Sequence, residues 1–222
     1  EISVRDWSSD VCSSDLGCAV ERYVFMYGDQ PWPEGITALQ LYAPVDLSAN
    51  PQLAVLLPRW RAALDGAPVG LVQDKDLHVT LDMISDAPGG DITAAERAAL
   101  ADAIRHELVN EPAYRGRIGG ALAYRSGAIL DISPAEPLRQ LHLALRRAIH
   151  TARGPNSTKY RVPKAHVSIA YATDTANSDD YQSKLRQVDP NNAPLQLNEV
   201  QLVELNMDRS VQIGRASCRE RV

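Results

Sequence analysis

Two short stretches of this chain carry a histidine and a hydroxyl side chain in the same arrangement. One reads His78-Val-Thr80-Leu, and the other reads His166-Val-Ser168-Ile. Both alternate with the period of a β-strand, which places the histidine and the hydroxyl on one face. An imidazole, whose ordinary pKa is about 6.5, exchanges protons near neutral pH, and a hydroxyl can donate a hydrogen bond to an anionic oxygen. We therefore expect the two pairs to face each other across one phosphate site.

Paired histidines supply the groups that cleavage of a phosphodiester needs. A base takes a proton from the attacking oxygen and an acid gives one to the leaving oxygen, each typically contributing about 10²–10⁴ in rate. Thr80 and Ser168 would hydrogen-bond the non-bridging oxygens, where charge develops. The sequence leaves open which of His78 and His166 is the base. It also leaves open a purely structural interpretation, in which both are half-buried strand residues bonded to backbone.

Other residues around the second histidine are weaker candidates for substrate binding. Lys164 lies two residues before His166, so it shares that face and could meet a phosphate or remain solvated. Tyr160 could stack on a base, as aromatic rings do without sequence preference, or pack between the lobes. Tyr171 alternates with Ile169, so we expect it to face the core and to take no part in catalysis.

The remaining histidines and a group of arginines give no specific functional signal. His106 lies on a polar helix face and should be solvated, whereas His142 and His150 flank an apolar stripe as boundary residues. Because there is no nearby cysteine and no His-x-x-x-His, we expect no metal site. Three arginines on one helix form a small basic face that could contact RNA or complement the helix C-terminus: Arg146, Arg147 and Arg153.

Hydrophobic periodicity indicates the elements that position the two histidines. Strands are expected at 20–27, 37–45, both histidine stretches, 114–124, 127–132 and 195–207. Helices are expected from Asn50-Pro51 with a kink at Pro58, from a capping box at Thr93, from a second capping box at Ser133, and at 178–188.

The histidine strands occupy matching places in a weak internal repeat. Each follows an amphipathic helix that ends in glycine, with 12 residues from Gly66 to His78 and 12 from Gly154 to His166. We therefore expect an α+β fold that is bilobal, with two pseudo-symmetric lobes, each an antiparallel sheet with flanking helices, around a central cleft. No Pro/Gly/Ser-rich linker separates the halves, so residues 17–212 should form a single domain.

Composition narrows the class of protein and of partner. The 222 residues are 45% apolar and 23% charged, which is typical of soluble globular proteins, and no apolar run is long enough to span a membrane. The net charge of −5 provides no global basic field, so a nucleic acid would be held locally, for example by its end.

Both ends of the chain resemble translated library adapters. We expect residues 1–16 and 213–222 to be non-native and to lie outside the domain. They contain Cys12 and Cys218, which leaves Cys18 as the one cysteine of the domain. A single cysteine forms no disulfide framework, in keeping with a cytoplasmic protein.

The paired tetrapeptides, their separation and the run His166-Val-Ser-Ile-Ala-Tyr171 resemble those of the 2H phosphoesterases, most closely the bacterial 2′-5′ RNA ligase-like proteins. The resemblance covers roughly residues 20–210. It implies a bilobal α+β fold that hydrolyses 2′,3′-cyclic phosphates to 2′-phosphates without metal or cofactor. It assigns His78 and His166 as the acid/base pair and Thr80 and Ser168 as phosphate ligands. In one departure, Pro163 lies three residues before the second histidine, where relatives often have proline directly before it.

The expected function is thus a monomeric, metal-independent cyclic phosphodiesterase that acts on an RNA terminus or a small cyclic nucleotide. One alternative is a ligase that joins RNA ends through a 2′-5′ bond, against which the acidic net charge argues mildly. The other is a non-catalytic RNA-binding module of the same fold.

Overall fold

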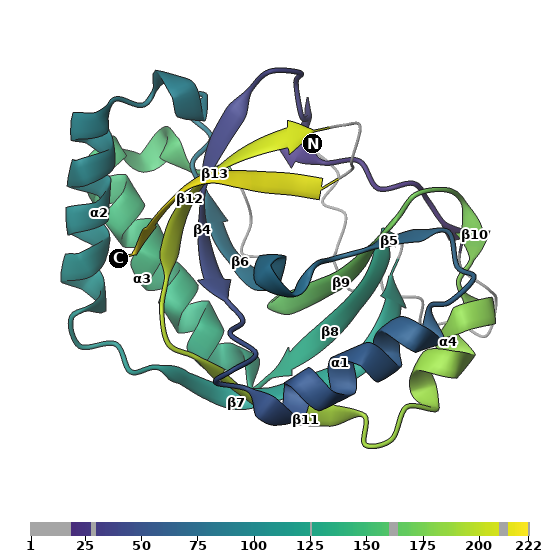
Figure 1. Ribbon diagram of the computed structural model, residues 1–222. Helices are drawn as coiled ribbons and strands as arrows, with labels where there is room; N and C mark the ends of the chain where they lie inside the picture. The colour runs from purple at the N-terminus through teal and green to yellow at the C-terminus, as the bar shows by residue number, and fades with distance from the viewer. Residues whose placement is uncertain (1–18, 28–29, 125, 160–163, 209–212, 222) are drawn as a thin grey trace, which may run out of the picture.

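The computed structural model describes residues 19–27, 30–124, 126–159, 164–208 and 213–221. Two antiparallel sheets form the framework of the molecule (Figure 1). The five-stranded sheet has the order β11 (Asn192–Leu197), β7 (Tyr114–Tyr124), β8 (Gly127–Ser133), β9 (His166–Ala172), β5 (Val69–Leu71). The four-stranded sheet has the order β13 (Ile213–Arg221), β12 (Gln201–Asp208), β4 (Thr37–Pro44), β6 (His78–Met83).

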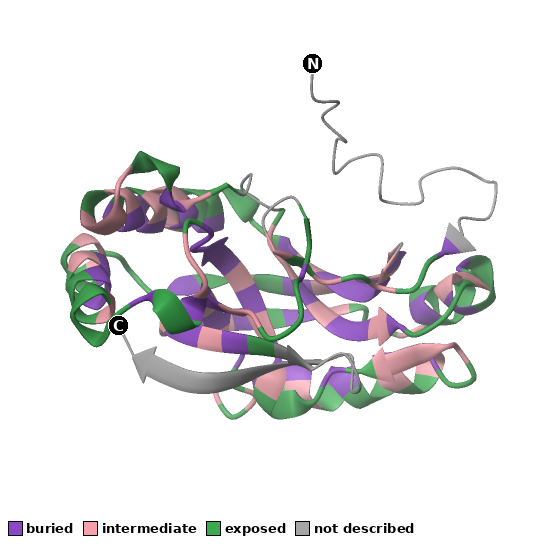
Figure 2. Ribbon diagram, turned by 90° about the horizontal axis from the view of Figure 1, so that it is seen from above, coloured by how far each residue is buried: buried purple, intermediate pink, exposed green. Residues whose placement is uncertain are grey.

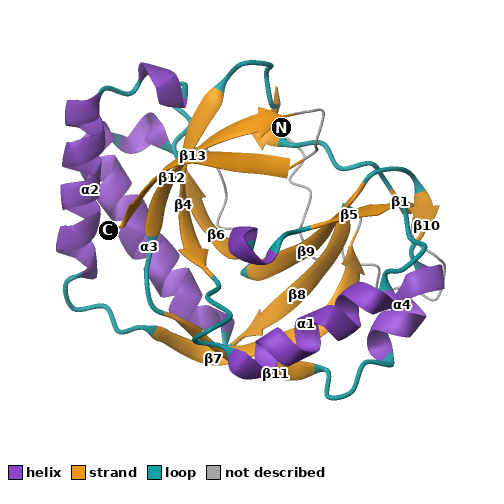
Figure 3. Cartoon of the chain, in the orientation of Figure 1, coloured by secondary structure: helices purple, strands orange, loops and turns teal. Residues whose placement is uncertain are grey.

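Smaller elements complete the chain, as Figure 3 shows. The helices are α1 (Pro51–Ala63), α2 (Ala94–Leu108), α3 (Ala135–Arg153) and α4 (Asp179–Arg186), with 3-10 turns η2 (Asp74–Asp76), η3 (Gly89–Asp91) and η4 (Pro155–Ser157). Two short strand pairs join β1 (Ala19–Val20) to β10 (Ala176–Asn177) and β2 (Met26–Tyr27) to β3 (Gln30–Pro31). None of the helices in the described ranges is long and apolar enough to cross a membrane.

The helices cross between the two lobes. α1 follows β4 of the four-stranded sheet, yet it packs with α4 on the five-stranded sheet, beside β11. α3 follows β8 of the five-stranded sheet, yet it packs with α2 on the other lobe, against β6. The bilobal α+β fold is therefore confirmed, but the helix before each histidine strand covers the opposite lobe.

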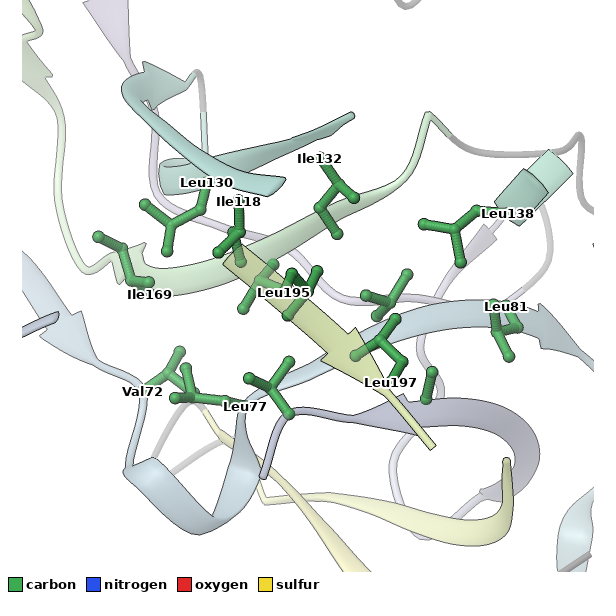
Figure 4. Packing of buried hydrophobic residues seen from close by; sticks show 14 of the residues in the cluster. Val72, Leu77, Leu81, Ile118, Leu130, Ile132, Leu138, Ile169, Leu195 and Leu197 are labelled. Atoms are coloured by element: carbon green, nitrogen blue, oxygen red, sulfur yellow. The ribbon is translucent and has the colours of Figure 1, made fainter. Parts of the chain in front are cut away.

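A continuous hydrophobic core joins the lobes. It includes Leu41 of β4, Leu81 of β6, Leu130 of β8 and Leu195 of β11, each at most 2% exposed. Figure 4 shows side chains of both sheets in this cluster, and Figure 2 shows buried positions alternating along the strands. Both sheets bury apolar side chains in this one core, so the hydrophobic effect stabilises the two lobes together.

Helix α1 begins as the sequence predicts, but its first polar residue has a different role. Pro51 occupies the first helical position, where its missing N–H costs nothing. The helix continues through Pro58 to Ala63. Asn50 makes no side-chain cap. Its amide instead donates to the carbonyl of Gln196 at 3.0 Å and accepts from the N–H of Gln196 at 2.7 Å, which covers the outer edge of β11.

One predicted capping box is confirmed and the other is wrong. At α2, the Thr93 N–H donates to the Glu96 carboxylate at 2.8 Å, and the Glu96 N–H donates to the Thr93 hydroxyl at 3.3 Å. At α3, Ser133 stays in β8, paired with β7, and Pro134 precedes the helix without a side-chain cap. Glu136 therefore pairs with Arg139, at 2.7 Å, instead of closing a box.

Two strand predictions are also wrong. The expected strand 195–207 is two strands, β11 and β12, which belong to different sheets, because the chain passes from one lobe to the other between them. The expected strand 20–27 reduces to the short strands β1 and β2, and Tyr23 between them stacks on Tyr171 of β9. The predicted domain bounds stay a prediction. The backbone of 213–221 adds the edge strand β13, and residues 1–18 lie outside the described part.

Candidate active site

The two histidine strands pack against each other where the sheets meet. β5 lies beside β9, and the pairing extends through the N–H of Val72, which donates to the Ile169 carbonyl at 2.9 Å. After the turn η2, Leu77 leads into β6, and its carbonyl accepts from the N–H of Val45 at 2.9 Å. A link of a few residues therefore joins the edge of one sheet to the edge of the other and holds β6 beside β9.

Both imidazoles are oriented by the same backbone contact. His78 Nδ1 lies 2.6 Å from the carbonyl oxygen of Asp76, and His166 Nδ1 lies 2.8 Å from that of Lys164. A carbonyl oxygen only accepts, so Nδ1 carries the hydrogen in both rings, and Nε2 is the nitrogen that can exchange a proton. A non-catalytic role for the two histidines also predicted such hydrogen bonds to backbone, and they are present. The same bonds hold each ring in the tautomer with the hydrogen on Nδ1, which leaves Nε2 for acid/base chemistry.

Both strands contain a β-bulge at the same place in the tetrapeptide. The register of β6 against β4 skips Leu81, and the register of β9 against β8 skips Ile169. Each is the residue directly after the hydroxyl residue, Thr80 or Ser168. A bulge re-aims the side chains that follow it. The pseudo-symmetry of the two tetrapeptides therefore extends to their backbone irregularity.

Tyr171 packs against the hydrophobic core as expected, but the second bulge also brings it to the hydroxyl residue of its strand. Skipping Ile169 returns Tyr171 to the side of the sheet that bears Ser168, and the two side chains are hydrogen-bonded. Its ring stacks on Tyr23 at 4.7 Å and lies 5.6 Å from Phe25. Burial raises the pKa of the Tyr171 phenol, so its hydroxyl keeps its proton at neutral pH. Strict alternation missed this residue because the sequence carries no signal of the bulge.

The two histidines have different neighbours. The ring of Tyr42 on β4 stacks on His78 with a centroid distance of 3.6 Å and an interplanar angle of 13°. His166 instead lies opposite Asp131 of β8. Burial lowers the pKa of the His166 imidazole, although the Asp131 carboxylate and the bond to the Lys164 carbonyl act in the opposite direction. Burial therefore favours the neutral form of His166.

The predicted substrate residues differ in what the structure shows of them. Thr80 and Ser168 each share the strand face of their histidine and are half-buried. The Lys164 ammonium lies 3.7 Å from the carboxylate of Asp131, on the side of His166. Tyr160 lies outside the described residues.

A buried ion pair supports β6 from behind. Asp82 has a fully buried side chain and receives hydrogen bonds from Arg146 Nε at 2.9 Å and Nη2 at 3.0 Å. His142 Nδ1 bonds to the carbonyl of Leu81, the bulged residue. His142 is 3% exposed, so the expectation of a boundary position was wrong. Helix α3 therefore holds the strand that carries His78 and Thr80.

The predicted basic face on α3 was also wrong, because each arginine meets a carboxylate. Arg146 pairs with Asp82, Arg147 lies 3.1 Å from Glu107, and Arg153 lies 2.9 Å from Asp86.

The other helix histidines behave as the sequence indicates. His106 is exposed, and His150 is half-buried with Nε2 2.8 Å from the Thr158 hydroxyl. Within the described ranges, no group of three or more histidine, cysteine, aspartate or glutamate side chains is arranged to hold a metal ion.

Solved structures share this fold at low sequence identity. A phosphoesterase is 18% identical with a TM-score of 0.58, over 84% of this chain and 98% of its own. LigT of E. coli in apo form is 18% identical with a TM-score of 0.57, over 84% of this chain and 97% of its own. LigT has also been solved with 3′-AMP, at 17% identity and a TM-score of 0.54, over 84% and 98% of the two chains. No curated protein matches the chain.

The family assignment comes from the sequence. The model of the 2′-5′ RNA ligase superfamily matches residues 49–209, well over half of the chain. The matched segment includes both tetrapeptides, β6 with its bulge and β9 with its bulge. The chain therefore belongs to the 2′-5′ RNA ligase superfamily, the 2H phosphoesterases.

Proposed function

We propose that this protein is a metal-independent 2′,3′-cyclic phosphodiesterase that acts on RNA ends or small cyclic nucleotides and leaves a 2′-phosphate. The observation that carries the proposal is the duplicated arrangement of His78 and His166. Each imidazole is fixed through Nδ1 by the carbonyl two residues earlier, on a strand that bulges after its hydroxyl residue. The superfamily membership and the solved complex of LigT with 3′-AMP support a nucleotide as substrate.

In the proposed reaction, the two histidines divide the proton transfers. The neutral form of His166, favoured by burial, takes a proton from water as the water oxygen bonds to phosphorus. The bond from phosphorus to the 3′-oxygen breaks, and His78 in its imidazolium form gives that oxygen a proton. The products are a 3′-hydroxyl and a 2′-phosphate. Thr80 and Ser168 donate hydrogen bonds to the non-bridging oxygens as their charge rises.

Single substitutions of the histidines test the mechanism. With adenosine 2′,3′-cyclic phosphate, His78→Ala and His166→Ala should each lower kcat by about 10²–10⁴, because each removes one acid or base. His106→Ala, at an exposed helix position, is the matched control. Chromatography of the products should show the 2′-phosphate. Full activity of either active-site variant, or loss of activity with a chelator, would contradict the proposal.

The same preparations distinguish the alternatives. Tight binding of a cyclic-phosphate RNA that stays intact would indicate a binding module. A new 2′-5′ linkage between RNA ends, without net hydrolysis, would indicate a ligase.

A further inference from the structure

A row of basic side chains lies on the same sheet face as His166. Asp131 on β8 is the cross-strand partner of His166, and Gly119 on β7 is the partner of Asp131. Cross-strand partners share a face, and so do residues two apart on one strand. Arg117 and Arg115 lie two and four residues before Gly119 on β7. Both therefore belong to the face that carries His166.

These two arginines keep their charge uncompensated. Both are exposed, and among the described residues the polar partners of their guanidiniums are neutral amides on β11. Arg115 Nη1 donates to Gln196 Oε1 at 3.1 Å, and Arg117 Nη2 donates to Asn192 Oδ1. An amide oxygen orients a guanidinium without cancelling its positive charge.

Many other arginines of the described residues are ion-paired. Seven described arginines on helices α1, α2 and α3 meet carboxylates, whereas Arg59 of α1 donates to the backbone carbonyl of Asp189. The seven are Arg61, Arg97, Arg105, Arg139, Arg146, Arg147 and Arg153. On the His166 face, the described strand residues include one acidic side chain, Asp131, which is paired with Lys164. A local positive field therefore remains on a chain whose net charge is −5.

The geometry places this charge within reach of a chain that continues beyond the site. β7 lies two strand spacings from β9, about 10 Å, and Arg117 and Arg115 lie about 7 Å and 14 Å along the strand from the row of His166. A 2′,3′-cyclic mononucleotide has a single phosphate, which lies at the histidines, so it has no further phosphate to offer the two arginines. A polynucleotide that ends at His166 has further phosphates to offer at these distances.

We propose that Arg115 and Arg117 form a binding surface for the sugar-phosphate backbone of single-stranded RNA, next to the terminal cyclic phosphate. The inference rests on the proposed function, and it selects RNA ends over free cyclic nucleotides as the substrate class. Binding there depends on phosphate charge, so it is independent of base sequence and weakens with salt.

The test compares a long and a short substrate in one enzyme. The variant is Arg115→Gln/Arg117→Gln, and the control is Arg105→Gln/Arg139→Gln, which removes the same charge from exposed positions on α2 and α3. The substrates are adenosine 2′,3′-cyclic phosphate and an RNA octamer that ends in a 2′,3′-cyclic phosphate. The ratio of kcat/KM between octamer and mononucleotide should fall at least tenfold in the variant, through KM, and stay at its wild-type value in the control.

Salt dependence gives a second readout. Loss of two phosphate contacts should reduce the slope of log affinity against log salt by about 1.4, because each contact on a single strand contributes about 0.7. Fluorescence anisotropy with an octamer that ends in a 2′-phosphate measures this slope without turnover. An unchanged substrate ratio together with an unchanged slope would overturn the inference. Failure of the wild-type protein to hydrolyse either substrate would instead overturn the proposed function, and anisotropy would still test the surface.

Discussion

The buried pair of Asp82 and Arg146 offers a quantitative test of how the His78 strand is held. Asp82→Ala removes a carboxylate that is fully buried and takes its two hydrogen bonds away from the Arg146 guanidinium, which is 20% exposed. It also removes the acceptor of the Met83 N–H, which donates to Asp82 Oδ1 at 2.9 Å. In the wild-type protein, the Asp82 carboxylate therefore accepts two hydrogen bonds from Arg146 and a third from the backbone N–H of Met83.

These contacts set the expected loss of stability. Removing one partner of a buried ion pair costs about 3–5 kcal/mol, because the remaining charge loses its compensation. Arg146 keeps some contact with water, which places the cost near the lower end, and the orphaned Met83 N–H adds to it. We expect Asp82→Ala to lower the free energy of unfolding by about 3–4 kcal/mol. A domain with an ordinary stability of about 5–15 kcal/mol would still fold.

Urea unfolding followed by circular dichroism measures the effect. With a slope of about 1–3 kcal/mol per M, the midpoint should fall by more than about 1 M. Arg146→Met should destabilise to a similar extent, because it leaves the buried carboxylate unpaired. The double variant Asp82→Ala/Arg146→Met should cost clearly less than the sum of the two single variants, since neither charge then remains buried alone. Glu136→Gln, which breaks an exposed pair on the same helix, is the control and should leave the midpoint unchanged.

Two outcomes would refute this reasoning. A cost below about 1 kcal/mol for Asp82→Ala would mean that the pair is no better than a surface salt bridge. Strict additivity in the double variant would mean that the two side chains act independently.

Two further predictions concern pH. Burial lowers the pKa of His142 below its ordinary value of 6.5, so the unfolded chain binds more protons than the folded chain below that pH. The free energy of unfolding should therefore fall as the pH drops through about 6. His142→Asn, which does not titrate, should weaken this pH dependence in urea unfolding at pH 7.5 and 5.5, and an unchanged dependence would show that His142 is not its source. The Asp131 carboxylate raises the pKa of His166 against the effect of burial. Asp131→Asn should therefore move the acid limb of the pH profile of kcat/KM, measured with adenosine 2′,3′-cyclic phosphate, to lower pH. A move to higher pH would show that Asp131 does not raise the pKa of His166.

The sequence alone was sufficient for features with local signals. Period-two alternation located both histidine strands, and the Thr93 and Glu96 pair located the start of α2, because each depends on residues close in the chain. Features that depend on register between distant strands were missed. Tyr42 stacks on His78 through the pairing of β4 with β6, and Tyr171 joins Ser168 through a bulge against β8. Neither register is encoded within one stretch of sequence.

The internal repeat predicted the two lobes but not which lobe each helix covers, because the helices cross between the lobes. α3 leads by way of Gly154 toward His166, but its middle holds β6 through His142 and Arg146, so one helix links both halves of the site. The repeat aligns Asp82 with Ala170, four residues after each histidine, and alanine offers no side chain for an ion pair. The two tetrapeptides therefore share their backbone irregularity, whereas the contacts that support their strands differ. A buried ion pair fixes the strand of His78, whereas backbone pairing with β5 on one side and β8 on the other fixes the strand of His166. Substitutions behind β6 should consequently impair the site more than equivalent substitutions behind β9.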